Sequence, residues 1–253
     1  MKKILKFSKG AGNTYKVVLS DETITLYDDL IIKYELLRRH SIKEELLEQI
    51  KQENQMLESY YKALHYLSVK MRTELEVRKY LQKKGFWESN IDSAIHRLKE
   101  EKLLDEALYV ELYVQDSIRL KSDGPDKIKR KLSTLGISKD VIESYFRDID
   151  DSIWEEKATR LLYKKNQSKH RDSGYVWKQK LETYLKNNGY SSKYYQYALS
   201  GLLIEEDLDV LQKEKDKWQR KLSSKYEGKE LEFRIKQKLL QKGYSSESIS
   251  KIL

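Results

Sequence analysis

Four glycines at nearly constant spacing limit the possible folds of this chain more than any other feature. Gly85, Gly136, Gly189 and Gly243 lie 51, 53 and 54 residues apart. Each follows a leucine by four positions and precedes an apolar residue, as in Leu81-Gln-Lys-Lys-Gly85-Phe86. Glycine tolerates positive φ, and this pattern is typical of a helix that ends in a Schellman motif, where the leucine touches the residue after glycine. The spacing therefore predicts four helix C-termini built in the same way.

The residues after each glycine predict a second helix. A serine two residues beyond the glycine is well placed to cap it in three copies (Ser138, Ser191 and Ser245), while the first copy has Trp87. Apolar residues six and ten positions past each glycine share one helical face: Ile91/Ile95, Ile142/Phe146, Tyr195/Leu199 and Ile249/Leu253. A third helix is expected in the first three copies, at about 105–120, 150–165 and 205–222. The fourth copy is expected to hold two helices.

The first 30 residues follow a different period. Apolar residues alternate at Leu5/Phe7, Tyr15/Val17 and Ile24/Leu26, which predicts a small antiparallel sheet. We interpret the segment Gly10-Ala-Gly-Asn-Thr14 as a hairpin turn rather than a phosphate loop, because the Gly-Lys-Ser/Thr ending is absent. Two capping boxes are expected: Ser41 with Glu44 starts the first of two linking helices, and Thr73 with Glu76 starts the first repeat.

The predicted fold is all-α, with tandem three-helix repeats in an elongated curved array behind a small N-terminal antiparallel β-sheet. A unit of about 50 residues buries too little apolar surface to be stable alone, so neighbouring units should stack. The expected segments are the sheet region (1–40), linking helices (41–68), repeats 1 to 3 (69–120, 121–170 and 171–222) and an incomplete two-helix repeat 4 (223–253). We expect a monomer.

Composition limits the class of protein and its partners. The chain has no cysteine, which excludes disulfides and thiolate chemistry, and no apolar run long enough for a membrane span, so we expect a cytoplasmic protein. The formal net charge is +9, and residues 121–253 hold 29 bases against 21 acids. A polyanion would be attracted first to this half. From charge alone, a well-solvated helical surface explains the excess equally well.

The residues of catalytic and metal sites do not form recognisable motifs. The four histidines are scattered singly (His40, His65, His96 and His170), without a zinc-binding pattern. Most carboxylates lie one helical turn from Lys or Arg, which lowers their pKa and makes them poor general bases. We therefore predict a protein that is not an enzyme and uses no cofactor or metal.

Three groups of basic residues in the C-terminal half are the candidate binding site. The first basic cluster is Lys127, Arg130 and Lys131, which we expect to point to solvent together because Ile128, Leu132 and Leu135 face the core. The second basic cluster is Arg160, Lys164 and Lys165. The third basic cluster is Arg234, Lys238 and Lys242, a stripe opposite Leu231, Ile235 and Leu239. Together they are candidates for contacts with a polyanion.

Three motifs in order resemble one known family. The segment Leu67-Ser-Val-Lys-Met-Arg-Thr-Glu-Leu-Glu-Val-Arg-Lys-Tyr-Leu81, closing at Gly85, is similar to the signature of the RecX regulatory proteins of Gram-positive bacteria. The segment from Leu98 through Leu103-Leu-Asp-Glu-Ala-Leu-Tyr-Val110 resembles the family's next motif, and Gly124-Pro-Asp-Lys-Ile128 resembles the third. The usual Lys-Gly-Pro run is interrupted, since Ser122-Asp123 separates Lys121 from Gly124. The resemblance spans essentially the whole chain.

The resemblance implies a specific partner. Proteins of this family bind the RecA recombinase filament on DNA and inhibit its recombinase, ATPase and co-protease activities, which would make this chain a regulator of DNA repair and recombination and of the SOS response. The alternative is a sequence-independent helical DNA-binding or architectural protein that acts without a protein partner. A helical scaffold with no nucleic-acid role is a third possibility, and it predicts no salt-sensitive DNA binding.

Overall fold

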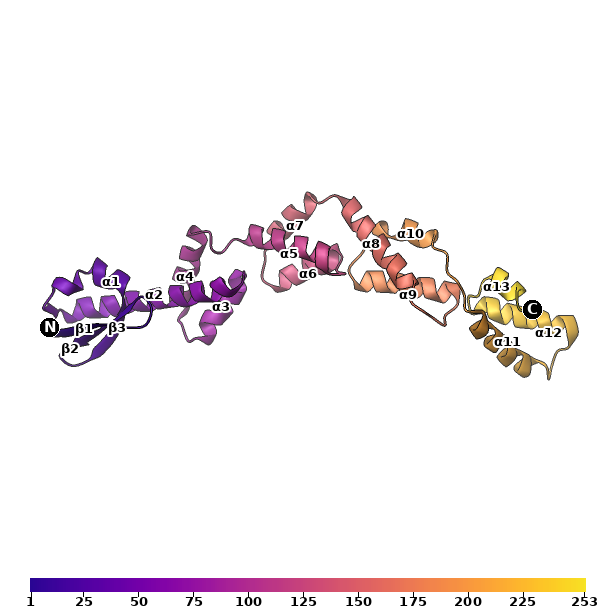
Figure 1. Ribbon diagram of the computed structural model, residues 1–253, viewed down its shortest axis with the longest axis horizontal. Helices are drawn as coiled ribbons and strands as arrows, with labels where there is room; N and C mark the ends of the chain where they lie inside the picture. Colours follow the sequence, from indigo (N-terminus) through magenta and orange to yellow (C-terminus); the bar gives the residue numbers. More distant parts are fainter. The chain divides into compact units, whose positions relative to one another are not determined.

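The computed structural model describes residues 1–253 (Figure 1). These residues divide into two compact units. The first unit holds residues 1–111 with 134–141, and the second holds 112–133 with 142–253. The strands are β1 (Lys2–Lys9), β2 (Thr14–Leu19), β3 (Thr23–Tyr27) and β4 (Ser41–Ile42). The helices are α1 (Asp28–Lys33), α2 (Glu44–Val69), α3 (Glu74–Lys83), α4 (Glu88–Glu100), α5 (Glu106–Leu120), α6 (Pro125–Thr134), α7 (Lys139–Arg147), α8 (Asp151–Asn166), α9 (Gly174–Asn187), α10 (Gln196–Ser200), α11 (Leu208–Leu222), α12 (Gly228–Gln241) and α13 (Ser246–Ser250), with 3₁₀ turns η1 (Leu36–Arg38) and η2 (Ser192–Tyr194). No helix combines the length and apolar character needed to cross a membrane.

The N-terminal residues form the antiparallel sheet that their alternation predicts, in the order β3-β2-β1-β4. Val17 in the central strand pairs with Phe7 on one side and Ile24 on the other. The buried face of the sheet packs with Leu47 and Ile50 of α2, which closes a small core. Residues 10–13 connect β1 to β2, so the interpretation of the glycine-rich segment as a hairpin turn is confirmed.

The predicted start of the next helix is wrong. Ser41 does not cap it, because Ser41 pairs with Lys3 in the sheet and α2 begins at Glu44, with Lys43 as N-cap and no side-chain cap bond. The two expected linking helices are one helix of 26 residues. No glycine or proline interrupts this segment, and Tyr60 and Ala63 continue its buried face onto α4.

The four glycine turns are confirmed as helix C-termini. The φ angles of Gly85, Gly136, Gly189 and Gly243 are 86°, 86°, 84° and 85°. At the first turn the N–H of Phe86 donates to the carbonyl of Leu81 at 3.3 Å, which is the long bond of a Schellman motif, and Gly85 N–H donates to Gln82 at 2.9 Å. The same pair of bonds recurs at the third and fourth turns. The local prediction therefore holds in backbone detail.

The second helices follow the serine prediction in two copies out of three. The hydroxyl oxygens of Ser138 and Ser245 accept from backbone N–H groups three residues later, at 3.4 and 3.1 Å. Ser191 does not cap a helix, and the chain after it forms η2 before α10. Lys193 and Tyr194 in η2 both bond the carboxylate of Asp151 at the start of α8. This tertiary anchor accounts for the broken second helix.

The predicted third helices are present as α5, α8 and α11, although α11 begins at Leu208 rather than near residue 205. Asp207 caps it instead, accepting from the N–H groups of Asp209 and Val210. The capping box of Thr73 with Glu76 is confirmed in both directions. The last copy consists of two helices, α12 and α13, which enclose a core with α11.

Each later glycine turn docks on the N-terminus of an earlier helix, and we call this contact a joint. In the first joint the Thr73 hydroxyl donates to the carbonyl of Leu135 at 2.8 Å, joining the start of α3 to the turn after α6. A Cβ on Gly136 would lie 2.7 Å from the Cβ of Leu75, so glycine here also permits the close approach.

Two further joints repeat this arrangement. The N–H of Gly124, just before α6, donates to Asn188 O at 2.7 Å, and the Ser173 hydroxyl, just before α9, donates to Lys242 O at 2.6 Å. The carbonyls of Gly189 and Gly243 accept from the second residue of α6 and of α9, at 3.1 and 3.3 Å. The joints thus satisfy helix C-terminal carbonyls with helix N-terminal donors.

Candidate protein and nucleic-acid interface

Two of the three bases in the first basic cluster share one buried carboxylate. Asp123 is only 5% exposed, and Lys127 lies 2.8 Å from one of its oxygens while Lys131 bonds the other. Burial raises the pKa of Asp123, but the two lysines lower it by more, so the pKa of Asp123 lies below its ordinary value. The expectation that all three bases point to solvent together is therefore wrong for Lys127 and Lys131. Arg130 is exposed, and its Nε donates to Asp126 O at 3.2 Å.

The signal for this neutralisation was present in the sequence. Asp123 precedes Lys127 by four positions, but it lies outside the helix, so helical periodicity did not place it. Asp123 thus supplies the counter-ion for two bases of the cluster that follows it.

The second basic cluster presents its charges to solvent from α8. Arg160 is 76% exposed and forms an i,i+4 ion pair with Glu156 at 2.7 Å. Lys164 and Lys165 are also exposed, and no ion pair holds either of them. The exposed ring of Tyr163 lies beside them in the sequence, and the ammonium of Lys165 lies 5.9 Å from the Tyr184 ring centre. This is the most accessible of the three predicted clusters.

The third basic cluster is intermediate between the first and the second in how many of its bases are already paired. Arg234 pairs with Glu230 at 3.6 Å, and Lys238 bonds the Gln241 side chain at 3.2 Å. Lys242 bonds Glu214 of α11, so it joins two helices rather than extending a free stripe. Arg234 and Lys238 remain available to an anion at modest cost, because their partners are exposed or uncharged.

Lys157 is a basic residue that the sequence analysis missed. Its ammonium donates to the carbonyls of Ser117 and Ile118 at 2.6 and 2.8 Å, near the C-terminus of α5. Burial lowers the pKa of Lys157 to about 8. The side chain fixes α8 to the end of α5 and is not available to a ligand. Nothing in its local sequence distinguishes it from Arg160 or Lys164.

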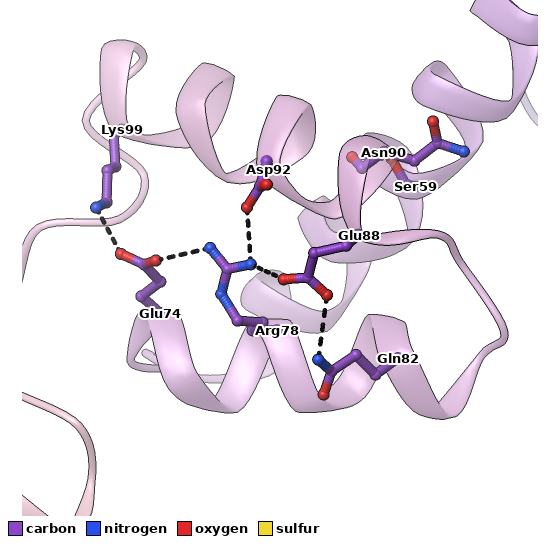
Figure 2. Close-up of polar contacts among 8 residues, drawn as sticks. All are labelled: Ser59, Glu74, Arg78, Gln82, Glu88, Asn90, Asp92 and Lys99. Atoms are coloured by element: carbon purple, nitrogen blue, oxygen red, sulfur yellow. Dashed lines mark hydrogen bonds and ion pairs between the residues drawn. The ribbon is translucent and has the colours of Figure 1, made fainter.

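Acidic side chains of α3 and α4 form a network of ion pairs around Arg78, shown in Figure 2. Arg78 bonds Asp92 at 2.7 Å, Glu74 at 3.2 Å and also Glu88. Glu74 is shared with Lys99 at 2.5 Å. The hydrogen bond that Arg78 donates to Asp92, followed by those that it donates to Glu74 and Glu88, holds the pKa of Arg78 above its ordinary value. These carboxylates are held as ion pairs and are poor candidates for proton transfer.

Residues that could hold a metal do not gather anywhere. His96 has a carboxylate four residues later, Glu100, with 3.8 Å between the nearest atoms, but both side chains are exposed and no third ligand joins them. No group of three or more His, Cys, Asp or Glu side chains lies close enough to bind a metal ion. The features that distinguish the surface are its basic side chains.

Comparisons with known proteins agree on one family. The profile of the RecX first three-helix domain matches residues 60–98, and that of the RecX second three-helix domain matches residues 105–145. The chain is 34% identical to "Regulatory protein RecX" of Halalkalibacterium halodurans, over 89% of this chain and 86% of that protein. It is 35% identical to the protein of the same name from Streptococcus agalactiae, over 92% of each chain.

Two solved structures share the fold. One, described as regulatory protein RecX, superposes with a TM-score of 0.65 at 24% identity and covers 78% of this chain and 98% of its own. The other, RecX from Lactobacillus salivarius, superposes with a TM-score of 0.54 at 27% identity, covering 58% of this chain and 95% of its own.

Proposed function

This chain belongs to the RecX family of regulatory proteins, and from that premise we propose that it binds the RecA recombinase filament on DNA and inhibits its recombinase, ATPase and co-protease activities. The observation that carries the proposal is the extent of the similarity, which covers about nine tenths of the chain rather than one motif. The protein would act in the cytoplasm as a binding regulator without chemistry of its own.

The exposed bases of α8 support contact with nucleic acid. Arg160, Lys164 and Lys165 are exposed within one and a half helical turns, and only Arg160 has a carboxylate partner. Phosphate contacts by such side chains release counterions, so binding should weaken steeply with salt. We assign DNA phosphate contact first to the second basic cluster, then to Arg130, Arg234 and Lys238. Lys127, Lys131 and Lys242 contribute less, because internal carboxylates already hold them.

A second candidate function is sequence-independent DNA binding without a protein partner. The same exposed cluster favours it, because phosphate contacts require no recombinase. The two functions differ in one measurable respect. A protein that only binds DNA inhibits RecA by competing for DNA, and excess DNA relieves that inhibition, whereas a protein that binds the filament inhibits it when DNA is saturating.

The experiment is a titration of the protein into preassembled RecA–DNA filaments, with DNA-dependent ATP hydrolysis as the readout. We expect inhibition that persists at saturating DNA. A charge-reversal variant of the second basic cluster to Glu should inhibit less and show a flatter salt dependence. The matched control reverses three exposed lysines of the N-terminal sheet, Lys6, Lys9 and Lys16, which gives the same change in net charge. Wild-type protein that fails to inhibit at saturating DNA refutes RecA regulation by filament binding.

A further inference from the structure

One glycine turn and one helix N-terminus are left without the joint that occupies their equivalents. Three turns, at Gly136, Gly189 and Gly243, each dock on the start of an earlier helix, with atoms 2.4–2.8 Å from the position of an added Cβ. The turn at Gly85 is exposed, and an added Cβ there meets nothing within 4 Å. No hydrogen bond from the chain reaches the carbonyls of Lys84 and Gly85, whose equivalents accept bonds in the second and third joints.

Among the helices that end at a glycine turn, the one whose N-terminus no such turn contacts is α12. Residues 227–230 are all exposed, the N-cap Glu227 makes no side-chain cap bond, and an added Cβ on Gly228 meets nothing within 4 Å. The first N–H groups of a helix lack intrahelical acceptors, so α12 offers unpaired donors. In the second and third joints, the second helical residue donates to the glycine carbonyl. The equivalent donor in α12 is the N–H of Lys229.

We propose that copies of this chain associate head to tail, with the turn at Gly85 of one copy receiving the N-terminus of α12 from another. The contact is a fourth joint of the kind that the chain forms three times internally. It goes beyond the proposed function, since it requires neither RecA nor DNA.

Charge complementarity favours the start of α12 of a second copy as the partner of the Gly85 turn. Lys83 and Lys84 flank the open turn. Beside it lies a hollow of about 300 Å³ lined by Phe86, Trp87 and Lys62, and Lys62 is paired with Glu58 of the same lining. The start of α12 carries Glu227 and Glu230 with Lys229 between them, and because Glu230 pairs with Arg234, Glu227 is the acid available to Lys84. The C-terminal carbonyls of α3 also attract the positive end of the α12 dipole. The second joint forms without an N-cap side chain, because Gly124 occupies that position, so the lack of a hydroxyl at Glu227 is no obstacle.

Trp87 provides apolar area for the contact. It is 76% exposed and occupies the position of serine in the other three copies. Exposed tryptophans are enriched where protein surfaces meet. The contact joins two different patches, so it is not a two-fold symmetric interface and further copies can add. Because the internal joints are intramolecular, with effective concentrations on the order of millimolar, the same contact between copies should be weak. Dilute protein should then be the expected monomer.

Sedimentation velocity of the full chain across a concentration series tests the proposal. We expect the average sedimentation coefficient to rise with protein concentration and the rise to diminish with salt. Gly85→Asn should abolish the rise, because Asn tolerates positive φ but places a Cβ on the docking face. The matched control is Gly12→Asn, at a hairpin glycine with φ of 58° and open space around it, which should associate like wild type.

A charge swap across the proposed contact tests directly whether Lys84 and Glu227 meet. Lys84→Glu and Glu227→Lys should each weaken association by roughly tenfold, and the double variant should recover it. Circular dichroism on every variant separates loss of association from loss of folding. The proposal is overturned if the wild type shows no concentration dependence, if Gly85→Asn associates as strongly as Gly12→Asn, or if the double variant associates no better than the single ones.

Discussion

Alanine substitution at two of the glycine turns should separate the cost of the turn from the cost of the joint. Gly85 and Gly189 have nearly the same backbone, with φ of 86° and 84°. They differ in surroundings, because a Cβ on Gly85 meets nothing within 4 Å, whereas one on Gly189 would lie 2.4 Å from the backbone nitrogen of Lys127. Gly85→Ala is therefore the matched control for Gly189→Ala.

The magnitudes follow from these two geometries. The left-handed conformation costs an alanine about 1–2 kcal/mol at either site, and the smaller entropy of the unfolded alanine chain affects both variants equally. At Gly189 the Cβ also overlaps backbone atoms that cannot rotate away, which adds about 1–3 kcal/mol. Forcing the joint apart puts at risk the bond from Gly124 N–H to Asn188 O, worth about 1 kcal/mol. The predicted difference between the variants is about 2–4 kcal/mol.

Native-state hydrogen exchange is the appropriate assay, because arrays of repeats need not unfold in one step and a global midpoint would average over units. In Gly189→Ala, protection should fall in α6 and α9, which meet at the second joint. In Gly85→Ala, the loss should be smaller and confined to α3 and α4. Equal losses of protection in the two variants would show that the close approach at Gly189 carries no energy, and the account of the joints would fail.

Four other predictions concern individual side chains and the expected absence of a metal. Reversing the first basic cluster to Glu should lower the free energy of unfolding, because the buried Asp123 would then face carboxylates. Reversing the second basic cluster should leave the free energy of unfolding nearly unchanged, and thermal denaturation of both variants checks the difference. The Glu206 carboxylate accepts from Gly174 N–H at 2.6 Å and from Ser245 N–H and hydroxyl at 3.1 and 2.9 Å. Burial raises the pKa of Glu206, but hydrogen bonds from Gly174, Ser248 and Ser245 outweigh it and the pKa is lowered, so its contribution to stability is present above the ordinary carboxyl pKa and is lost as pH falls through the lower folded value; Glu206→Gln should flatten that part of the pH–stability curve. Arg78→Met should destabilise the α3–α4 pair by about 2 kcal/mol, because three carboxylates lose their shared cation, and urea unfolding that matches wild type would contradict this. Elemental analysis after chelator-free purification should find no stoichiometric zinc or iron.

The glycine turns show how much of this fold is local. The Schellman bonds at Gly85 close within five residues, and the capping box of Thr73 and Glu76 closes within three, so the sequence pattern is sufficient to predict both. The alternation of the first strands is equally local. The same kind of signature failed at Ser41, because Lys3 on a distant strand pairs with it and backbone pairing in the sheet took precedence over capping.

The candidate site depended more on tertiary structure. Helical spacing was the argument for the first and third basic clusters, whereas the second basic cluster is exposed on α8 and its role in binding stays a prediction. Helical spacing misjudged Lys127 and Lys131, because the loop before α6 turns Asp123 beneath the helix, and it did not anticipate that Lys157 reaches carbonyls about 40 residues away in the sequence. The sequence by itself determined the four glycine helix ends and the apolar faces of most repeat helices, since those depend on bonds and periods within one or two turns. Only the tertiary structure decided which charges are already paired and which turns are joined, because those contacts connect residues that the chain separates by tens of positions.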